Sequence, residues 1–212
     1  MKKFIASIFA LLIAVSSWAE TKERAPILLG GGFALPYAYE RAEYNNDTIE
    51  TSMRRLGFNI TLGALPQKSN WGVIDNFTFA WPQSISAKYQ GKEYSTDTKD
   101  FKSLFLFETT IAFDYFFLNN EKFLLGAGPL LGMTVFTWST EYLSSANFAF
   151  GVGANIFGLY KVTDKFGFQF GVTGVFDFYG LGSVNTATTK NSYSGSTRDW
   201  TLTPFIGLSL IL

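Results

Sequence analysis

Large apolar side chains alternate with small or polar ones in segment after segment of this sequence. In residues 166–178, one face carries Phe166, Phe168, Phe170, Val172, Phe176 and Phe178, and the other carries Gly167, Gln169, Gly171, Thr173 and Asp177. A period of two residues predicts a β-strand, because successive side chains of a strand point to opposite faces. The sequence therefore predicts strands with one large apolar face and one small, polar face.

The same bias recurs along the chain after its first twenty residues. We expect strands at 27–40, 54–65, 73–88, 101–118, 123–140, 147–162, 166–182 and 198–212. A soluble β-sandwich or a lipocalin-like binder would have to bury the apolar faces in a shared interior. The complementary faces are too small and polar for a dry core, whereas a membrane barrel turns its apolar face to lipid. The pattern predicts an all-β, eight-stranded, antiparallel, up-and-down transmembrane β-barrel.

The links between these segments alternate in length. The expected outer loops are 41–53, 89–100, 141–146 and 183–197, and the expected periplasmic turns are 66–72, 119–122 and 163–165. Short periplasmic turns that alternate with longer outer loops are typical of outer-membrane barrels. Aromatic residues gather towards both strand ends, as interfacial girdles require. Pro36, Pro82, Pro129 and Pro204 fall inside expected strands, where we predict bulges or strand ends.

The N-terminus has the pattern of a secretory signal peptide. Lys2 and Lys3 precede an apolar run from Phe4 to Val15, and Ser17-Trp18-Ala19 resembles a small-x-small cleavage site. The run is shorter than the roughly 20 residues that a spanning helix needs. We therefore expect a signal peptide over 1–19 and one barrel domain over 20–212, exported to the cell outer membrane.

The composition excludes several classes of function. The chain has no Cys and no His, which removes thiolate chemistry, the usual general base near neutral pH and the commonest transition-metal ligand. Basic and acidic residues number 17 each, and without Lys2 and Lys3 the net charge is about −2. That balance gives no excess of basic residues of the kind that binds nucleic acid. We predict no enzyme activity, no cofactor and no metal site.

Two groups of residues are the candidate functional residues. The expected inward face carries charged side chains that we expect to neutralise one another across the lumen, with a role in ion selectivity as an alternative: Arg55, Lys102, Glu108, Asp114, Lys161 and Asp177. The outer loops carry polar residues that are candidate contacts for surface molecules: Asn46, Asp47, Asn191 and Tyr193. The 183–197 link can also be a solvated loop that only connects two strands.

Glycines form a third feature of the inward face. They concentrate in its periplasmic half: Gly30, Gly32, Gly63, Gly126, Gly128, Gly167, Gly171 and Gly207. If no other side chain fills the space they leave, the barrel is a narrow channel for ions or small ligands, and Leu at Gly128 and Gly171 would reduce flux. If the lumen is filled, as is usual for eight strands, the outer loops are the functional part of the protein.

With its export signal, amphipathic strands and alternating loops, the chain resembles the small outer-membrane barrels of the OmpA, OmpX, OmpW and opacity-protein kind. The resemblance implies lipid and the outer-membrane assembly machinery as partners, and an OmpW-like barrel would transport small apolar compounds. Barrel enzymes of this size use a catalytic His, which is absent here. The sequence ends in Leu212, where such barrels usually end in an aromatic residue. We expect a non-enzymatic surface protein with structural, adhesion or interaction roles, with the narrow channel as the alternative.

Overall fold

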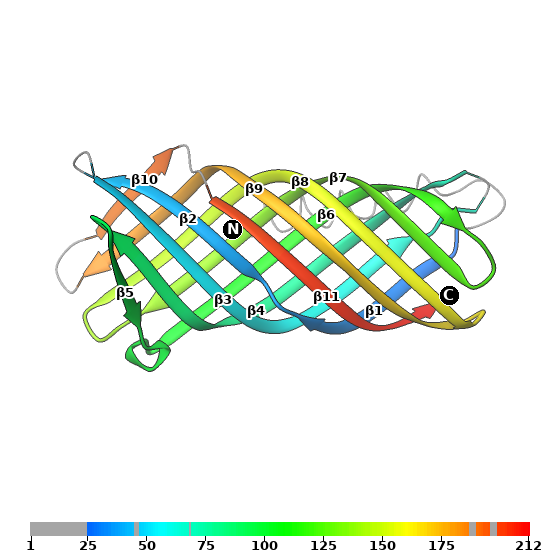
Figure 1. The fold of residues 1–212 in the computed structure, drawn as a ribbon, viewed down its shortest axis with the longest axis horizontal. Helices are drawn as coiled ribbons and strands as arrows, with labels where there is room; N and C mark the ends of the chain where they lie inside the picture. Colours follow the sequence, from blue (N-terminus) through cyan, green and yellow to red (C-terminus); the bar gives the residue numbers. More distant parts are fainter. Residues whose placement is uncertain (1–24, 45–46, 68, 187–189, 196–198) are drawn as a thin grey trace.

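The computed structural model describes residues 25–44, 47–67, 69–186, 190–195 and 199–212 and shows one closed, tilted β-barrel (Figure 1). Its elements are β1 (Ile27–Ala34), β2 (Tyr37–Tyr44), β3 (Asp47–Ala64), β4 (Trp71–Tyr89), β5 (Lys92–Thr96), η1 (Thr98–Asp100), β6 (Ser103–Asn119), β7 (Phe123–Ser139), β8 (Leu143–Thr163), β9 (Phe166–Thr186), β10 (Lys190–Gly195) and β11 (Asp199–Ile211). Within the described ranges, no helix is long and apolar enough to cross a membrane.

Eight antiparallel transmembrane strands make the ring in the part of the chain that is described. They are β3, β4, β6, β7, β8, β9, β11 and the broken strand formed by β1 and β2. The ring closes because β1 pairs with β3 on one side and with β11 on the other. The predicted eight-stranded up-and-down barrel is confirmed.

Each of the four strand prolines coincides with an interruption in pairing. Pro36 separates β1 from β2, and the β3–β4 register shifts opposite Pro82, between Arg54 and Arg55. Pro129 lies where the β6–β7 pairing is interrupted, and Pro204 faces the break between β1 and β2. Proline has no N–H to donate to a neighbouring strand, so the barrel bends at these points. The expected bulges and strand ends are confirmed.

Most of the expected outer loops are strands, which corrects the predicted boundaries. β2 and β3 stay paired as far as Tyr44 and Asp47, and β9 continues to Thr186 and pairs with β10. β5 folds back on β4 over residues 85–89. These polar segments were assigned to loops because they lack the apolar alternation of a lipid-facing strand. Their backbone ladders continue beyond the lipid, where side chains need no apolar face.

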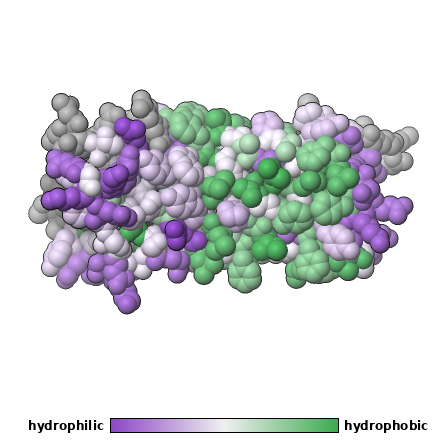
Figure 2. All heavy atoms as spheres, in the orientation of Figure 1, coloured by the Kyte–Doolittle hydropathy of each residue, from purple (hydrophilic) through white to green (hydrophobic). Residues whose placement is uncertain are grey.

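The outer surface divides into an apolar belt and a polar extension. Figure 2 shows apolar residues over the middle of the barrel and towards the end where the chain's C-terminus lies, and polar residues over the end that carries β5 and β10. Within the belt, Phe33, Leu131 and Ile206 are 71%, 60% and 62% exposed. Exposure of this kind across a whole face requires lipid as the solvent.

Aromatic clusters mark the two borders of the belt. At the outer border, the Trp200 ring lies 5.6 Å from the Tyr37 ring and 5.9 Å from the Tyr39 ring, and Trp81 lies 5.8 Å from Phe105. At the periplasmic border, Trp71 and Tyr115 are 5.3 Å apart. Amphipathic rings settle at the headgroup level, so these clusters define the span that lies in the bilayer.

The periplasmic half of the interior is filled by an apolar core. The rings of Phe116 and Phe157 are 6.3 Å apart, and those of Phe157 and Phe205 are 6.4 Å apart. Leu28 and Ile74 are fully buried in the same cluster. These rings come from β6, β8 and β11, so they tie distant parts of the wall together across the lumen.

Replacement of the central ring, Phe157→Ala, is expected to lower the free energy of unfolding by about 3–5 kcal/mol, because it leaves a cavity among rigid neighbours. The matched variant is Phe176→Ala on β9, whose side chain is exposed to lipid. It should cost less, since lipid chains fill the vacated space. Urea unfolding of the refolded barrel in lipid vesicles measures both, and equal losses would contradict a packed periplasmic core.

Candidate functional site

A polar network lies in the interior beside the apolar core. The Thr61 hydroxyl is 2.6 Å from Asn59 Oδ1 and 2.9 Å from Asn76 Oδ1, and Gln169 Nε2 donates to Thr61 Oγ1 at 3.0 Å. Ser209 Oγ donates to Gln169 Oε1 at 2.7 Å. The network joins β3, β4, β9 and β11 across the lumen. Most of these buried amides and hydroxyls bond to one another, although Asn76 Nδ2 has no partner among the described residues.

The glycines of the inward face accommodate this filling. An added Cβ would meet a side chain of the interior at four of them: Gln169 at Gly30, Ile74 at Gly63, Phe116 at Gly126 and Phe205 at Gly171. At Gly32, Gly128 and Gly207 it would meet the backbone of a neighbouring strand. The missing side chains therefore make room for large partners and close backbone approach. Leu at Gly128 or Gly171 would disrupt packing rather than plug a pore.

Arg55 is the centre of a charged layer nearer the outer end. The side chain is 4% exposed, and its guanidinium carbon lies 5.3 Å from the centroid of the Phe136 ring. Glu40, Glu108 and Asp177 act on it electrostatically from β2, β6 and β9. Its Nη2 atom also lies 3.5 Å from the Met53 sulfur. One cation therefore faces three acids in this layer, where a low dielectric strengthens their mutual attraction.

The other predicted interior residues occupy different positions. Glu108 accepts a hydrogen bond from Thr203 at 3.1 Å, and Asp114 accepts one from Asn155 at 2.6 Å, so Asp114 is held apart from the Arg55 layer. Lys161 is half-buried near the periplasmic end of β8. Lys102 is exposed, which corrects its assignment to the inward face. The reason is that β6 begins at Ser103, so Lys102 belongs to the outer connection.

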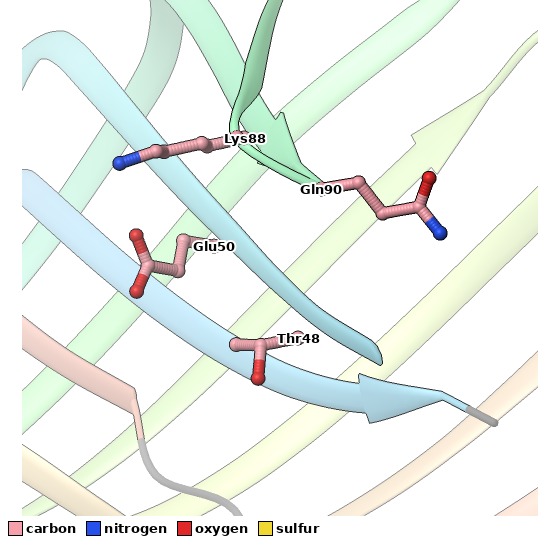
Figure 3. Close-up of a pocket in the computed structure, with 5 residues that line it drawn as sticks. Thr48, Glu50, Lys88 and Gln90 are labelled. Atoms are coloured by element: carbon pink, nitrogen blue, oxygen red, sulfur yellow. The ribbon is translucent and has the colours of Figure 1, made fainter. Parts of the chain in front are cut away.

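A pocket of about 260 Å³ lies on the polar extension. It is lined by Thr48, Glu50, Lys88, Gln90 and Gly91. Figure 3 shows Thr48 and Glu50 on β3 beside Lys88 at the end of β4 and Gln90 in the turn that follows. Glu50 and Lys88 are register partners. The carboxylate, ammonium, hydroxyl and amide groups together suit a polar or zwitterionic group of a surface molecule.

The predicted loop contacts lie on the same extension. Asp47 begins β3, and Asn191 and Tyr193 belong to β10. Asn46 lies outside the described residues. The pocket residues were not predicted as a group, because Glu50 and Lys88 are 38 positions apart and only the β3–β4 register brings them together.

Sequence reasoning also missed Glu40 and Phe136 as neighbours of Arg55. Phe136 was hidden among the many aromatic residues, although its parity along β7 matches that of the inward Thr134. Among the described residues, no group of three or more His, Cys, Asp and Glu side chains is placed to hold a metal ion.

The closed ring, apolar belt, aromatic borders and filled interior together define a small outer-membrane β-barrel. The crystal structure of outer membrane protein OprG from Pseudomonas aeruginosa matches with a TM-score of 0.61 and 12% identity, over 89% of this chain and 96% of that one. Neisserial surface protein A matches with a TM-score of 0.52 and 13% identity, over 88% and 97%. Outer membrane protein AlkL, solved in lipid bilayers, matches with a TM-score of 0.54 and 14% identity, over 89% and 90%.

At these identities the likeness concerns the fold, and it confirms the resemblance to small outer-membrane barrels. No protein-family model matches the sequence. No curated protein matches it either.

Arg55→Ala is expected to destabilise the barrel by about 0.5–3 kcal/mol, because it removes a buried cation that Glu40, Glu108 and Asp177 attract. Arg54→Ala is the matched control: the neighbouring side chain is exposed, and its loss should change stability by less than about 0.5 kcal/mol. Adding Glu108→Gln to Arg55→Ala should restore part of the loss. Urea unfolding in vesicles measures all three, and an additive double variant would show that Arg55 and Glu108 are not coupled.

Proposed function

We propose that this protein is a non-enzymatic outer-membrane barrel that displays a rigid recognition surface outside the cell. The observation that carries the proposal is the polar β-extension beyond the outer aromatic border, with its pocket between β3 and the end of β4. Strand pairing holds the extension in shape, so a partner meets a surface that is already organised. Its partners are polar molecules of a host, a matrix or a neighbouring cell.

Exposed tyrosines support a binding role for the extension. Tyr94 on β5 is 52% exposed, and Tyr142 in the turn between β7 and β8 is 75% exposed. Both lie at the outer end: Tyr94 is on the hairpin of β4 and β5, and Tyr142 lies beyond β6 in the order of the wall. Tyr offers a large contact area at a low entropic cost and is enriched in recognition surfaces. Acidic and basic residues are mixed over these hairpins, which favours protein or neutral glycan partners over polyanions.

The filled interior supports a surface role rather than conduction. Phe116, Phe157 and Phe205 occupy the periplasmic half, and Arg55 and Phe136 occupy the outer half. Eight strands leave an interior just wide enough for side chains. No His or Cys exists in the chain to supply the usual base or nucleophile of a barrel enzyme. The hairpins are therefore the part of the molecule available for function.

Transport of small apolar compounds is the second candidate function. One observation favours it: the β4–β6 pairing stops at Ala80 and Leu106, although both strands continue further out. β4 then pairs with β5, so the hydrogen-bonded wall is interrupted above this point. Trp81, Phe105 and Trp138 lie near the interruption and would offer an apolar path from the extension to the lipid.

Shortening the hairpins tests the recognition surface. Residues 42–49 and 183–192 are each replaced by Asn-Gly, which rejoins the register partners Arg41 with Glu50 and Gly182 with Tyr193. Cells that display the shortened barrel should lose attachment to immobilised laminin, fibronectin or a neutral glycan, falling to the level of cells without the barrel. The control is Glu121→Ala with Lys122→Ala in a periplasmic turn, which should leave attachment unchanged. Full attachment by the shortened, surface-displayed barrel would contradict the proposal.

Planar-bilayer recording separates the two candidates. The refolded wild-type barrel, inserted in the bilayer, should show no discrete conductance steps, because side chains from opposite walls fill its lumen. The variant Phe157→Ala with Phe205→Ala removes two of the three core rings and should introduce such steps. Reproducible steps in the wild type would contradict a closed lumen and favour transport.

A further inference from the structure

The outer face of β4 carries a carboxyl group in the middle of the apolar belt. Along this face the residues are Trp71, Val73, Asp75, Phe77, Phe79 and Trp81. Trp71 belongs to the periplasmic aromatic border and Trp81 to the outer one, and Asp75 lies between them. The neighbours Ile74 and Asn76 point inward, where Ile74 joins the apolar core and Asn76 joins the polar network. Asp75 therefore faces the lipid side of the wall.

The residues directly opposite Asp75 on the neighbouring strands are apolar. Its register partners are Leu62 on β3 and Ile111 on β6. The residue is 8% exposed, and its Oδ1 atom is buried without a hydrogen-bond partner among the described residues. In the interior, Glu108 and Asp114 each accept one hydrogen bond, from Thr203 and Asn155, although one oxygen of each is also without a partner.

A carboxyl group at this depth is unfavourable unless something pairs with it. Hydrocarbon supplies no hydrogen bond, so polar side chains inside a bilayer face a partner or mark a function. Polar side chains also hold membrane-embedded surfaces together through hydrogen bonds between them. Because Oδ1 is covered by neighbouring atoms, the Asp75 side chain has to turn outward to meet a group of another molecule.

We propose that Asp75 marks the centre of a homodimer interface, in which two barrels pack β4 against β4 within the membrane. In a twofold-symmetric interface, each residue on the axis meets its own copy. If the twofold axis is normal to the membrane, each residue of one barrel lies at the same depth in the bilayer as its copy in the other barrel. The group that a second copy offers to Asp75 is therefore the other Asp75.

Two carboxyl groups suit this arrangement chemically. A protonated carboxyl donates through its O–H and accepts through its C=O, so a facing pair satisfies both groups without a cation. Around the pair, Leu62, Val73 and Ile111 of each barrel would form the apolar part of the contact. A lipid-borne cation would be the alternative occupant, and it would leave the barrel monomeric.

Single-cysteine cross-linking tests the interface directly, because the chain has no native Cys. Val73→Cys and Ile111→Cys, in separate samples, place a thiol beside Asp75. The control is Val172→Cys on the outer face of β9, four transmembrane strands from β4 in either direction around the ring. In phosphatidylcholine vesicles, oxidation should produce a disulfide-linked dimer for the first two variants and not for the third. Monomer in all three, or equal dimer in all three, would overturn the proposal.

Substitutions of Asp75 in the Val73→Cys background then test its role. Asp75→Asn keeps a donor and an acceptor and should retain the dimer. Asp75→Leu removes both and should weaken dimerisation by roughly five- to tenfold, given the modest strength of hydrogen bonds in membranes. Phe176→Leu, on the outer face of β9, should have no effect. Heat-modifiable electrophoretic mobility confirms that each variant is folded, and an undiminished dimer in folded Asp75→Leu would show that Asp75 does not hold the interface.

Discussion

In hydrocarbon no water is available to backbone N–H and C=O groups, so every strand that crosses a membrane must find a partner on both edges. The closure of β1 onto β3 and β11 meets this requirement within the belt. The four prolines each lack a donor, and each lies where pairing is already interrupted. Outside the belt water satisfies the backbone, and there β4 exchanges β6 for β5 as its partner.

The narrow ring then dictates what lies inside. Large rings from one wall need space on the facing wall, and glycines provide it, as Gly171 does beneath Phe205. Polar groups buried by this packing have to pair with one another, which explains the Thr61–Gln169–Ser209 network. The apolar core, the polar network and the Arg55 layer thus follow from one geometric limit on the lumen.

Much of the fold could be predicted from the sequence, because lipid imposes a strict two-residue period on each strand within the belt. The period ends with the belt, which is why the outer strand extensions were assigned to loops. Parity alone assigned Arg55, Glu108 and Asp177 to the inward face, but it could not place Lys102, which precedes β6. The pocket on the polar extension could not be predicted without the β3–β4 register, which brings its lining residues together. The sequence did contain a signal for Asp75, since it shares the parity of Phe77 and Phe79 and so lies on the same face. The predicted apolar face of this strand was taken to begin at Phe77, and Asp75 was left out of it.

Polar residues of this barrel obey two different rules, and the contrast indicates where function lies. Inside, Glu108, Asp114 and Gln169 each have a hydrogen-bond partner from the same chain, although some buried atoms there, such as Glu108 Oε2 and Asp114 Oδ1, have none among the described residues. On the outer surfaces the matching is incomplete: the rim pocket gathers charged and polar groups that face solvent, and Asp75 faces lipid. These two surfaces are where the described part of the wall offers polar groups to another molecule. The interactions of this protein are therefore expected at its rim and along β4, with the lumen acting as the rigid support for both.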